Sequence, residues 1–138
     1  VRKMNTFINK VALHTFSSFD SGNKPSDDAE PERFYHGFVL GMVVNLADTY
    51  KVRSNRESGY GRYDVMIEPL DKTGKAFIFE FKVLDPDEDE ETLEDTIANA
   101  HRQIQEKKYE AELIAAGFLP KQIRKYGFAF RGKECLIG

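Results

Sequence analysis

The spacing of apolar residues changes along the chain, and this change separates predicted helices from predicted strands. Over about 32–47 apolar side chains recur every three or four residues, the period of a helix that buries one face. A shorter segment, 1–13, has the same period. Around 50–54, then over 63–67 and 77–83, apolar and polar residues alternate instead, which predicts three successive strands.

The second half of the chain continues this pattern. Helical spacing returns over about 90–116, and two short strands follow at 125–130 and 135–137. The turn at 71–75 is typical of an antiparallel hairpin between the second and third strands. The order helix, three strands, helix, strand predicts an α/β fold in which helices flank a central mixed sheet.

Length and composition fit one globular domain. The chain has 138 residues, 41% apolar and 31% charged, near the common domain size of about 100 to 150 residues. No apolar run approaches the roughly 18 to 20 residues of a membrane span, so no membrane partner is expected. Because Cys135 is the single cysteine, we expect a reducing cytoplasmic location. We interpret 1–29 as a helix and linker from a missing upstream domain, and 30–138 as the domain itself.

The charge is unevenly distributed. The net charge of −3 comes from 20 basic and 23 acidic residues, but eight of the acidic ones lie within 85–95. The other 15 acidic residues (23 less 8) are outnumbered by the 20 basic ones, which leaves +5 outside this segment. We interpret the acidic segment as a solvated helix start. Arg56 and Arg62 flank a turn and are candidates for gripping a nucleic acid backbone, although ordinary solvated arginines fit the sequence equally well.

Charged residues interrupt two of the predicted strands. Alternation places Glu80 and Lys82 on the face opposite the phenylalanines of 77–83, and Asp64 on the matching face of the preceding strand. Two carboxylates suit Mg²⁺ or Mn²⁺, and a lysine can orient a water molecule or stabilise phosphoryl charge. This set of residues is suited to phosphodiester hydrolysis. An ordinary Glu80–Lys82 ion pair on an exposed sheet face, with Asp64 a solvated strand residue, fits the spacing equally well.

The segments that carry these residues resemble a known family. The segments GRYDVMIEP (61–69) and FIFEFKV (77–83) resemble the D-x(n)-E-x-K signature of the PD-(D/E)XK nuclease superfamily. Four longer segments resemble, in order, the nuclease-like domain at the C-terminal end of bacterial AAA-ATPase-like proteins: 32–46, 54–64, 100–109 and 126–135. The resemblance covers 30–138 and implies a restriction-endonuclease-like core of order αβββαβ.

The resemblance also implies roles for single residues. Asp64 and Glu80 would bind Mg²⁺ or Mn²⁺, and Lys82 would be the catalytic lysine. Glu32 matches an acidic residue that many members place on the first core helix, near the metal site. His36 follows Glu32 by one helical turn and so lies on the same face, where a role beside the metal competes with a structural or surface role.

Gln103 and Tyr109 resemble the glutamine and tyrosine that follow the lysine on a helix in the RecB-like branch. Gln103 is therefore a candidate for nucleic acid binding. The gap of six residues between Gln103 and Tyr109 is longer than that pattern predicts.

Three functional hypotheses follow. The first is a Mg²⁺-dependent nuclease that hydrolyses DNA, as the C-terminal domain of a larger ATPase-like protein. The second is a catalytically silent module of that protein which binds nucleic acid or a protein. The third is a structural dimerisation module that forms a homodimer.

Overall fold

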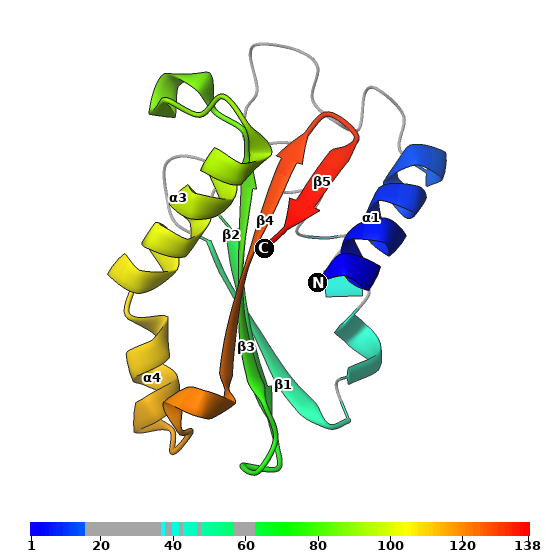
Figure 1. The fold of residues 1–138 in the computed structure, drawn as a ribbon. Helices are drawn as coiled ribbons and strands as arrows, with labels where there is room; N and C mark the ends of the chain where they lie inside the picture. Colours follow the sequence, from blue (N-terminus) through cyan, green and yellow to red (C-terminus); the bar gives the residue numbers. More distant parts are fainter. Residues whose placement is uncertain (16–36, 38–39, 42, 47, 57–62) are drawn as a thin grey trace.

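The computed structural model describes residues 1–15, 37, 40–41, 43–46, 48–56 and 63–138. In these ranges a five-stranded sheet has helices on both faces (Figure 1). Its strands are, in spatial order, β1 (Tyr50–Arg56), β2 (Tyr63–Pro69), β3 (Ala76–Val83), β4 (Ile123–Arg131) and β5 (Glu134–Ile137). Among these five described strands, β3 and β4 are parallel neighbours and the other neighbouring pairs are antiparallel. The predicted mixed sheet flanked by helices is therefore confirmed.

The parallel pairing of β3 and β4 requires a crossover, which two helices provide. They are α3 (Leu93–Glu106) and α4 (Tyr109–Ala115), and both lie on the same side of the sheet (Figure 1). Gly127 lets α3 approach β4 closely, because a Cβ atom there would come within 2.9 Å of the Cβ of Ala100. The helices thus cover the face that carries Asp64 and Glu80.

The prediction of a single helix over 90–116 is wrong, because the structure has two helices there. The helical structure starts at α3, whose first turn is closed by a capping box between Thr92 and Asp95. It breaks at Lys108, which has a left-handed φ of 58°. In an unbroken helix Leu113 would follow Ile104 by about two and a half turns and would face solvent. The break turns Leu113 back toward the sheet, where it packs in the same apolar cluster as Ile104.

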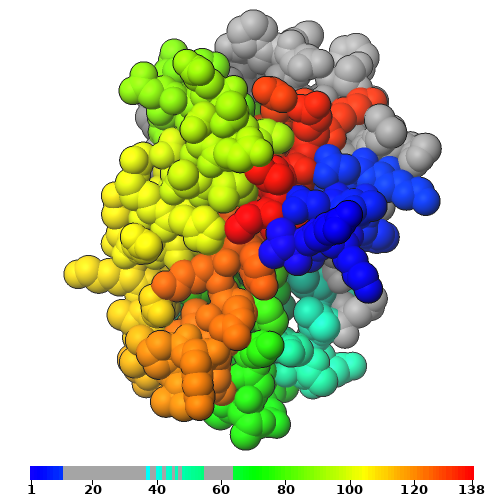
Figure 2. All heavy atoms as spheres, in the orientation of Figure 1, coloured from blue at the N-terminus to red at the C-terminus, as the bar shows by residue number. Residues whose placement is uncertain are grey.

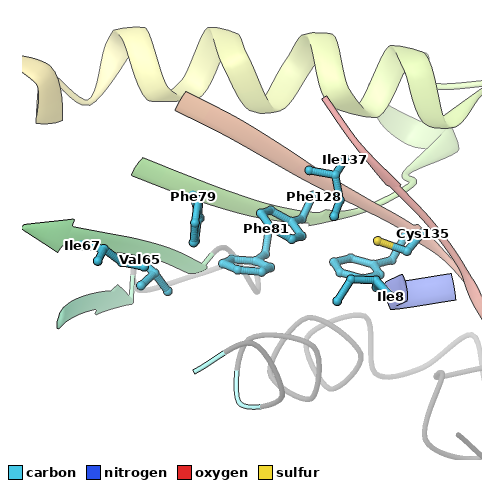
Figure 3. Close-up of a cluster of buried hydrophobic side chains, with 9 residues drawn as sticks. Ile8, Val65, Ile67, Phe79, Phe81, Phe128, Cys135 and Ile137 are labelled. Atoms are coloured by element: carbon cyan, nitrogen blue, oxygen red, sulfur yellow. The ribbon is translucent and has the colours of Figure 1, made fainter. Parts of the chain in front are cut away.

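The larger apolar cluster lies on the opposite face (Figure 3). It contains the alternate side chains of the strands that the sequence predicted to share a core, among them Val65, Phe79 and Phe81. The rings of Phe81 and Phe128 stack with centroids 4.8 Å apart. Because this face is filled by aromatic and aliphatic side chains, the charged residues of β2 and β3 point to the α3–α4 face.

Helix α1 (Arg2–Thr15) packs along the edge strand β5, and the two are in contact at the surface (Figure 2). The amide of Asn5 accepts a hydrogen bond from the backbone N–H of Ile137 (2.6 Å) and donates one to its carbonyl (2.9 Å). Asn9 makes the same pair of bonds to Cys135, at 2.8 and 2.6 Å. Ile8 adds its side chain to the larger cluster. These contacts satisfy backbone groups that an edge strand otherwise leaves unpaired. A linker role for 1–29 stays a prediction.

The helix predicted over 32–47 falls largely outside the described residues. Within it, Gly37, Leu40, Gly41 and Val43 are helical, and η1 (Val44–Leu46) forms a 3₁₀ turn. Across the described ranges, no helix has both the length and the apolar character to cross a bilayer.

Candidate active site

Asp64 and Glu80 lie directly opposite each other on β2 and β3. Only 2% of Asp64 and none of Glu80 is exposed, and Lys82, further along the same face of β3, is 3% exposed. The prediction that the three residues share one face is confirmed by the burial of their neighbours Met66 and Ile78 under α3 and α4. The alternative of an ion pair on an exposed sheet face is wrong, because this face is covered.

The ammonium group of Lys107 lies between the two opposed carboxylates. Its Nζ is 3.0 Å from Oε1 of Glu80 and 3.3 Å from Oδ2 of Asp64. The same Oδ2 accepts a hydrogen bond from the hydroxyl of Tyr109. Two buried carboxylates on adjacent strands repel each other unless a cation lies close to both. Lys107 provides that cation, although sequence reasoning did not select it.

Helical spacing and the break between α3 and α4 explain how Lys107 and Tyr109 reach the sheet. Lys107, the C-cap residue of α3, follows the buried Ile104 by three residues and so lies on the same face of the helix. The left-handed backbone of Lys108 then redirects the chain into α4. Tyr109 is therefore buried beside Ile78 and Asp64, whereas a continuous helix would carry it away from the face of Ile104. The long gap between Gln103 and Tyr109 in the sequence was the one signal of this break.

Lys82 is held by two carboxylates of its own. Its Nζ lies 2.7 Å from Oε2 of Glu88 and 3.1 Å from Oε1 of Glu90. These acids come from η2 (Pro86–Glu88) and the turn after it. The structure thus places Lys82 on the same face as Asp64 and Glu80 but directs its ammonium group toward the segment that follows β3.

Glu90 is the most enclosed member of this group. Its carboxylate accepts hydrogen bonds from the hydroxyl of Thr96 (2.7 Å), the backbone N–H of Asp85 (3.0 Å) and the amide of Asn99. Burial by itself raises the pKa of Glu90, but these hydrogen bonds and the charge of Lys82 outweigh it and hold the pKa below its ordinary value. A carboxylate with four such partners stays ionised and fixes the position of Lys82.

The prediction that the acidic segment is a solvated helix start is wrong for Glu90, which is only 2% exposed. The segment turns back over the end of β3, so that a buried lysine and a buried glutamate neutralise each other. Sequence reasoning missed this pairing, because consecutive acidic residues are usually solvated. A signal was available in Lys82 itself, since a lysine in a strand this apolar needs a nearby counter-charge.

Of the remaining predicted site residues, the structure describes the side chain of Gln103 alone. Gln103 is buried on α3, and within the described ranges its side-chain oxygen has no hydrogen-bond partner. It lines a surface cavity of about 590 Å³ together with four charged residues: Glu88, Asp89, Arg102 and Glu106. Glu32, His36 and Arg62 lie outside the described residues, as does the side chain of Arg56 at the end of β1.

Two carboxylates are thus available for a metal ion. In the described part of the chain, no group of three His, Cys, Asp or Glu side chains is arranged to hold one. Mg²⁺ commonly takes only one or two protein carboxylates and completes its shell with waters and substrate phosphate. The ammonium of Lys107 lies between Asp64 and Glu80, so these two carboxylates already stabilise a positive charge there. The donor set therefore fits a hard divalent ion.

Comparison with known proteins agrees with this geometry. A family model described as the PD-(D/E)XK nuclease superfamily matches residues 30–138. The five-stranded mixed sheet with flanking helices is consistent with the restriction-endonuclease-like fold of that superfamily. Comparisons with curated proteins and with solved structures gave no significant match. The family match begins after α1, so the helix that packs on β5 lies outside it.

Proposed function

The chain belongs to the PD-(D/E)XK nuclease superfamily, and on this basis we propose that it is a Mg²⁺- or Mn²⁺-dependent nuclease that hydrolyses DNA phosphodiester bonds. The observation that carries the proposal is the buried pair formed by Asp64 and Glu80, opposed in register and sharing one cation. Nucleases of this superfamily generally use divalent metal ions. Which ion this protein prefers, and that its substrate is DNA, are parts of the proposal.

Asp64 and Glu80 would hold the metal ion. Such an ion neutralises charge on a phosphoryl oxygen and lowers the pKa of water. Tyr109 supports Asp64 through its hydrogen bond and so keeps one of the two carboxylates in place. Glu32 on the first core helix would approach the same site.

Lys82 would act on the substrate when a bound phosphate competes with Glu88 and Glu90 for its ammonium group. Its four-carbon side chain is long enough for the ammonium to move from Glu88 and Glu90 toward a phosphate bound beside Glu80. There it would orient the attacking water or stabilise the charge that develops on the phosphoryl group. Before substrate binds, Glu88 and Glu90 would hold the ammonium of Lys82 through their ion pairs.

The nucleic acid itself would be bound by residues around this centre. Gln103 lines the cavity beside Glu88, while Arg56 and Arg62 would grip the backbone and His36 would lie near the metal. An upstream ATPase-like domain would deliver the DNA, in the cytoplasm of a bacterium. A homodimer stays a prediction.

A second candidate function is a catalytically silent module that binds nucleic acid or protein. The observation that favours it is the bridge of Lys107, because an ammonium between Asp64 and Glu80 allows both carboxylates to be buried without a metal ion. In that case the fold would keep the site as a structural ion-pair network. Cleavage and binding assays separate the two candidates.

The test is cleavage of plasmid and oligonucleotide DNA with Mg²⁺ or Mn²⁺. Asp64→Asn, Glu80→Gln and Lys82→Met should each lower the rate by roughly 10² or more, the usual scale for one acid–base or electrostatic group. Glu134→Gln is the matched control. It removes an exposed carboxylate on β5, a strand that pairs with β4 and with neither β2 nor β3. DNA binding by the wild type without cutting would favour the silent module. Full activity in a folded Asp64→Asn protein would overturn the assignment.

A further inference from the structure

The point between Asp64 and Glu80 is already occupied by the ammonium group of Lys107, and we propose that Lys107 is a built-in counter-cation which a divalent metal ion must displace. This inference rests on the proposed function, because it assumes that Asp64 and Glu80 are the metal ligands. It adds a means of regulation within the chain: Lys107 competes with the metal for the same two carboxylates.

The distances make this competition direct. Nζ of Lys107 lies 3.0 Å from Oε1 of Glu80 and 3.3 Å from Oδ2 of Asp64, two residues that are directly opposite in the β2–β3 pairing. A Mg²⁺ ion binds such oxygens at about 2.0 to 2.1 Å. An ion bound at that distance by these same two oxygens would lie in contact with the ammonium, and two cations in contact repel each other strongly in a site with little water. The metal and the ammonium therefore exclude each other.

The surroundings explain why the chain supplies a cation here. Asp64 and Glu80 are almost wholly buried, and two negative charges in that position are unfavourable without a neighbouring positive charge. Lys107 allows the protein to fold with the site intact before any metal binds. The side chain of Lys107 is 10% exposed, so its ammonium lies near the edge of the site and not in the centre of the core.

The position of Lys107 at a helix break suits a group that moves. It is the C-cap residue of α3, next to the left-handed Lys108 that is itself exposed. Its unbranched side chain can therefore swing outward without disturbing a helical turn packed on the sheet. Tyr109 holds Asp64 from α4 by a separate hydrogen bond, so the carboxylate keeps a donor after Lys107 leaves.

The competition has a measurable consequence. The protein is ready to bind metal only in the fraction of molecules where Lys107 has left the site, and the apparent affinity is reduced by that fraction. Lys107→Met removes the competitor and keeps a side chain of similar length. It should bind Mn²⁺ at least about tenfold more tightly than the wild type, because a unit charge in contact with both ligands is lost.

Calorimetric titration with Mn²⁺ tests this directly. Lys108→Met is the matched control, since it removes the same charge from the neighbouring exposed residue and should bind Mn²⁺ within about twofold of the wild type, as expected for a screened surface charge. If the wild type binds Mn²⁺ and Lys107→Met binds it equally or more weakly, the proposal that Lys107 is a counter-cation is overturned. The proposed metal site would still be supported. Binding by neither protein would overturn the metal site of the proposed function, and the counter-cation with it.

A second measurement uses the wild-type protein, in case Lys107→Met does not fold. Amine acetylation is followed by mass spectrometry, with Mn²⁺ and then with a chelator. Displacement predicts that acetylation of Lys107 rises several-fold with Mn²⁺, whereas the buried Lys82 stays protected and the exposed Lys108 stays reactive in both conditions. If Mn²⁺ binds and the acetylation of Lys107 does not change, the counter-cation is overturned.

Discussion

The hydroxyl of Tyr109 donates a hydrogen bond to Oδ2 of Asp64, which joins α4 to β2 across 45 positions of the chain. The ring of Tyr109 packs in the apolar cluster beneath α3 and α4, so the hydroxyl has little freedom. The orientation of Asp64 therefore depends on a residue outside the sheet. We therefore expect Tyr109 to act as a positioning residue for the opposed carboxylates.

Tyr109→Phe tests this dependence. The ring remains in its cluster, but Asp64 loses a donor, so we expect the free energy of unfolding to fall by about 1.5 to 3 kcal/mol, the scale of a hydrogen bond to a charged group. Mn²⁺ affinity should fall as well, because Asp64 is less well oriented. Urea unfolding and calorimetry measure the two effects. Tyr126→Phe is the control, because Tyr126 lies on β4 with its ring against Phe79. An equal loss of unfolding free energy and of Mn²⁺ affinity in both variants would contradict the prediction.

The sequence predicted the shared face of Asp64, Glu80 and Lys82 correctly because strand alternation is a local property. Each side chain's face follows from its position in the strand, and the register then brings Asp64 opposite Glu80. The apolar residues of β3 pointed to the same arrangement, since they had to form one core. No knowledge of distant contacts was needed for this part of the site.

The counter-charges could not be predicted in the same way. Helical spacing puts Lys107 on the sheet-facing side of α3 with Ile104, but its contact with Glu80 depends on how α3 packs against the sheet. Glu90 is buried only because the turn after β3 folds back over Lys82. Both features depend on tertiary packing, which a periodic pattern of apolar residues does not contain.

Glu90 gives the site a pH dependence. Hydrogen bonds and the charge of Lys82 hold its pKa in the folded protein below the ordinary value of 4.5. A lowered folded-state pKa adds stability that is present above the unfolded-state pKa and is lost as the pH falls through the folded-state pKa. Glu90→Gln should thus cost about 1.5 to 3 kcal/mol of unfolding free energy at pH 7, and this cost should shrink below about pH 4.5.

Urea unfolding at neutral and acidic pH measures this trend. Glu91→Gln is the matched control, because Glu91 is the exposed neighbour and its replacement should have a small effect at every pH. A cost for Glu90→Gln that stays constant from pH 7 down to pH 3 would show that the ionised carboxylate does not hold Lys82.

Cys135 reports on the integrity of the β5 edge. Burial raises the pKa of its thiol from 9.0 to about 12, which lowers the thiolate fraction near neutral pH by about a thousandfold. We therefore expect iodoacetamide to label Cys135 very slowly in the folded protein and quickly in urea. Fast labelling without denaturant would show that β5 separates readily from the sheet.

The two asparagines of α1 offer the last prediction. Asn5 and Asn9 satisfy the backbone N–H and C=O groups of Ile137 and Cys135, so replacing either by alanine leaves two edge-strand groups without their partners. Each replacement should cost about 1 to 3 kcal/mol of unfolding free energy. Thr6→Ala is the control, because Thr6 is exposed and its hydroxyl bonds only within α1.

The double variant Asn5→Ala, Asn9→Ala should also release the edge of β5. A free edge strand pairs readily with another chain, so we expect self-association that rises with protein concentration and is absent from Thr6→Ala. Light scattering measures the association, and faster labelling of Cys135 in the same samples would show that α1 has moved away. If the double variant is as stable and as monodisperse as Thr6→Ala, the hydrogen bonds from α1 contribute little, and the apolar contacts of Ile8 and Met4 hold the helix on the sheet.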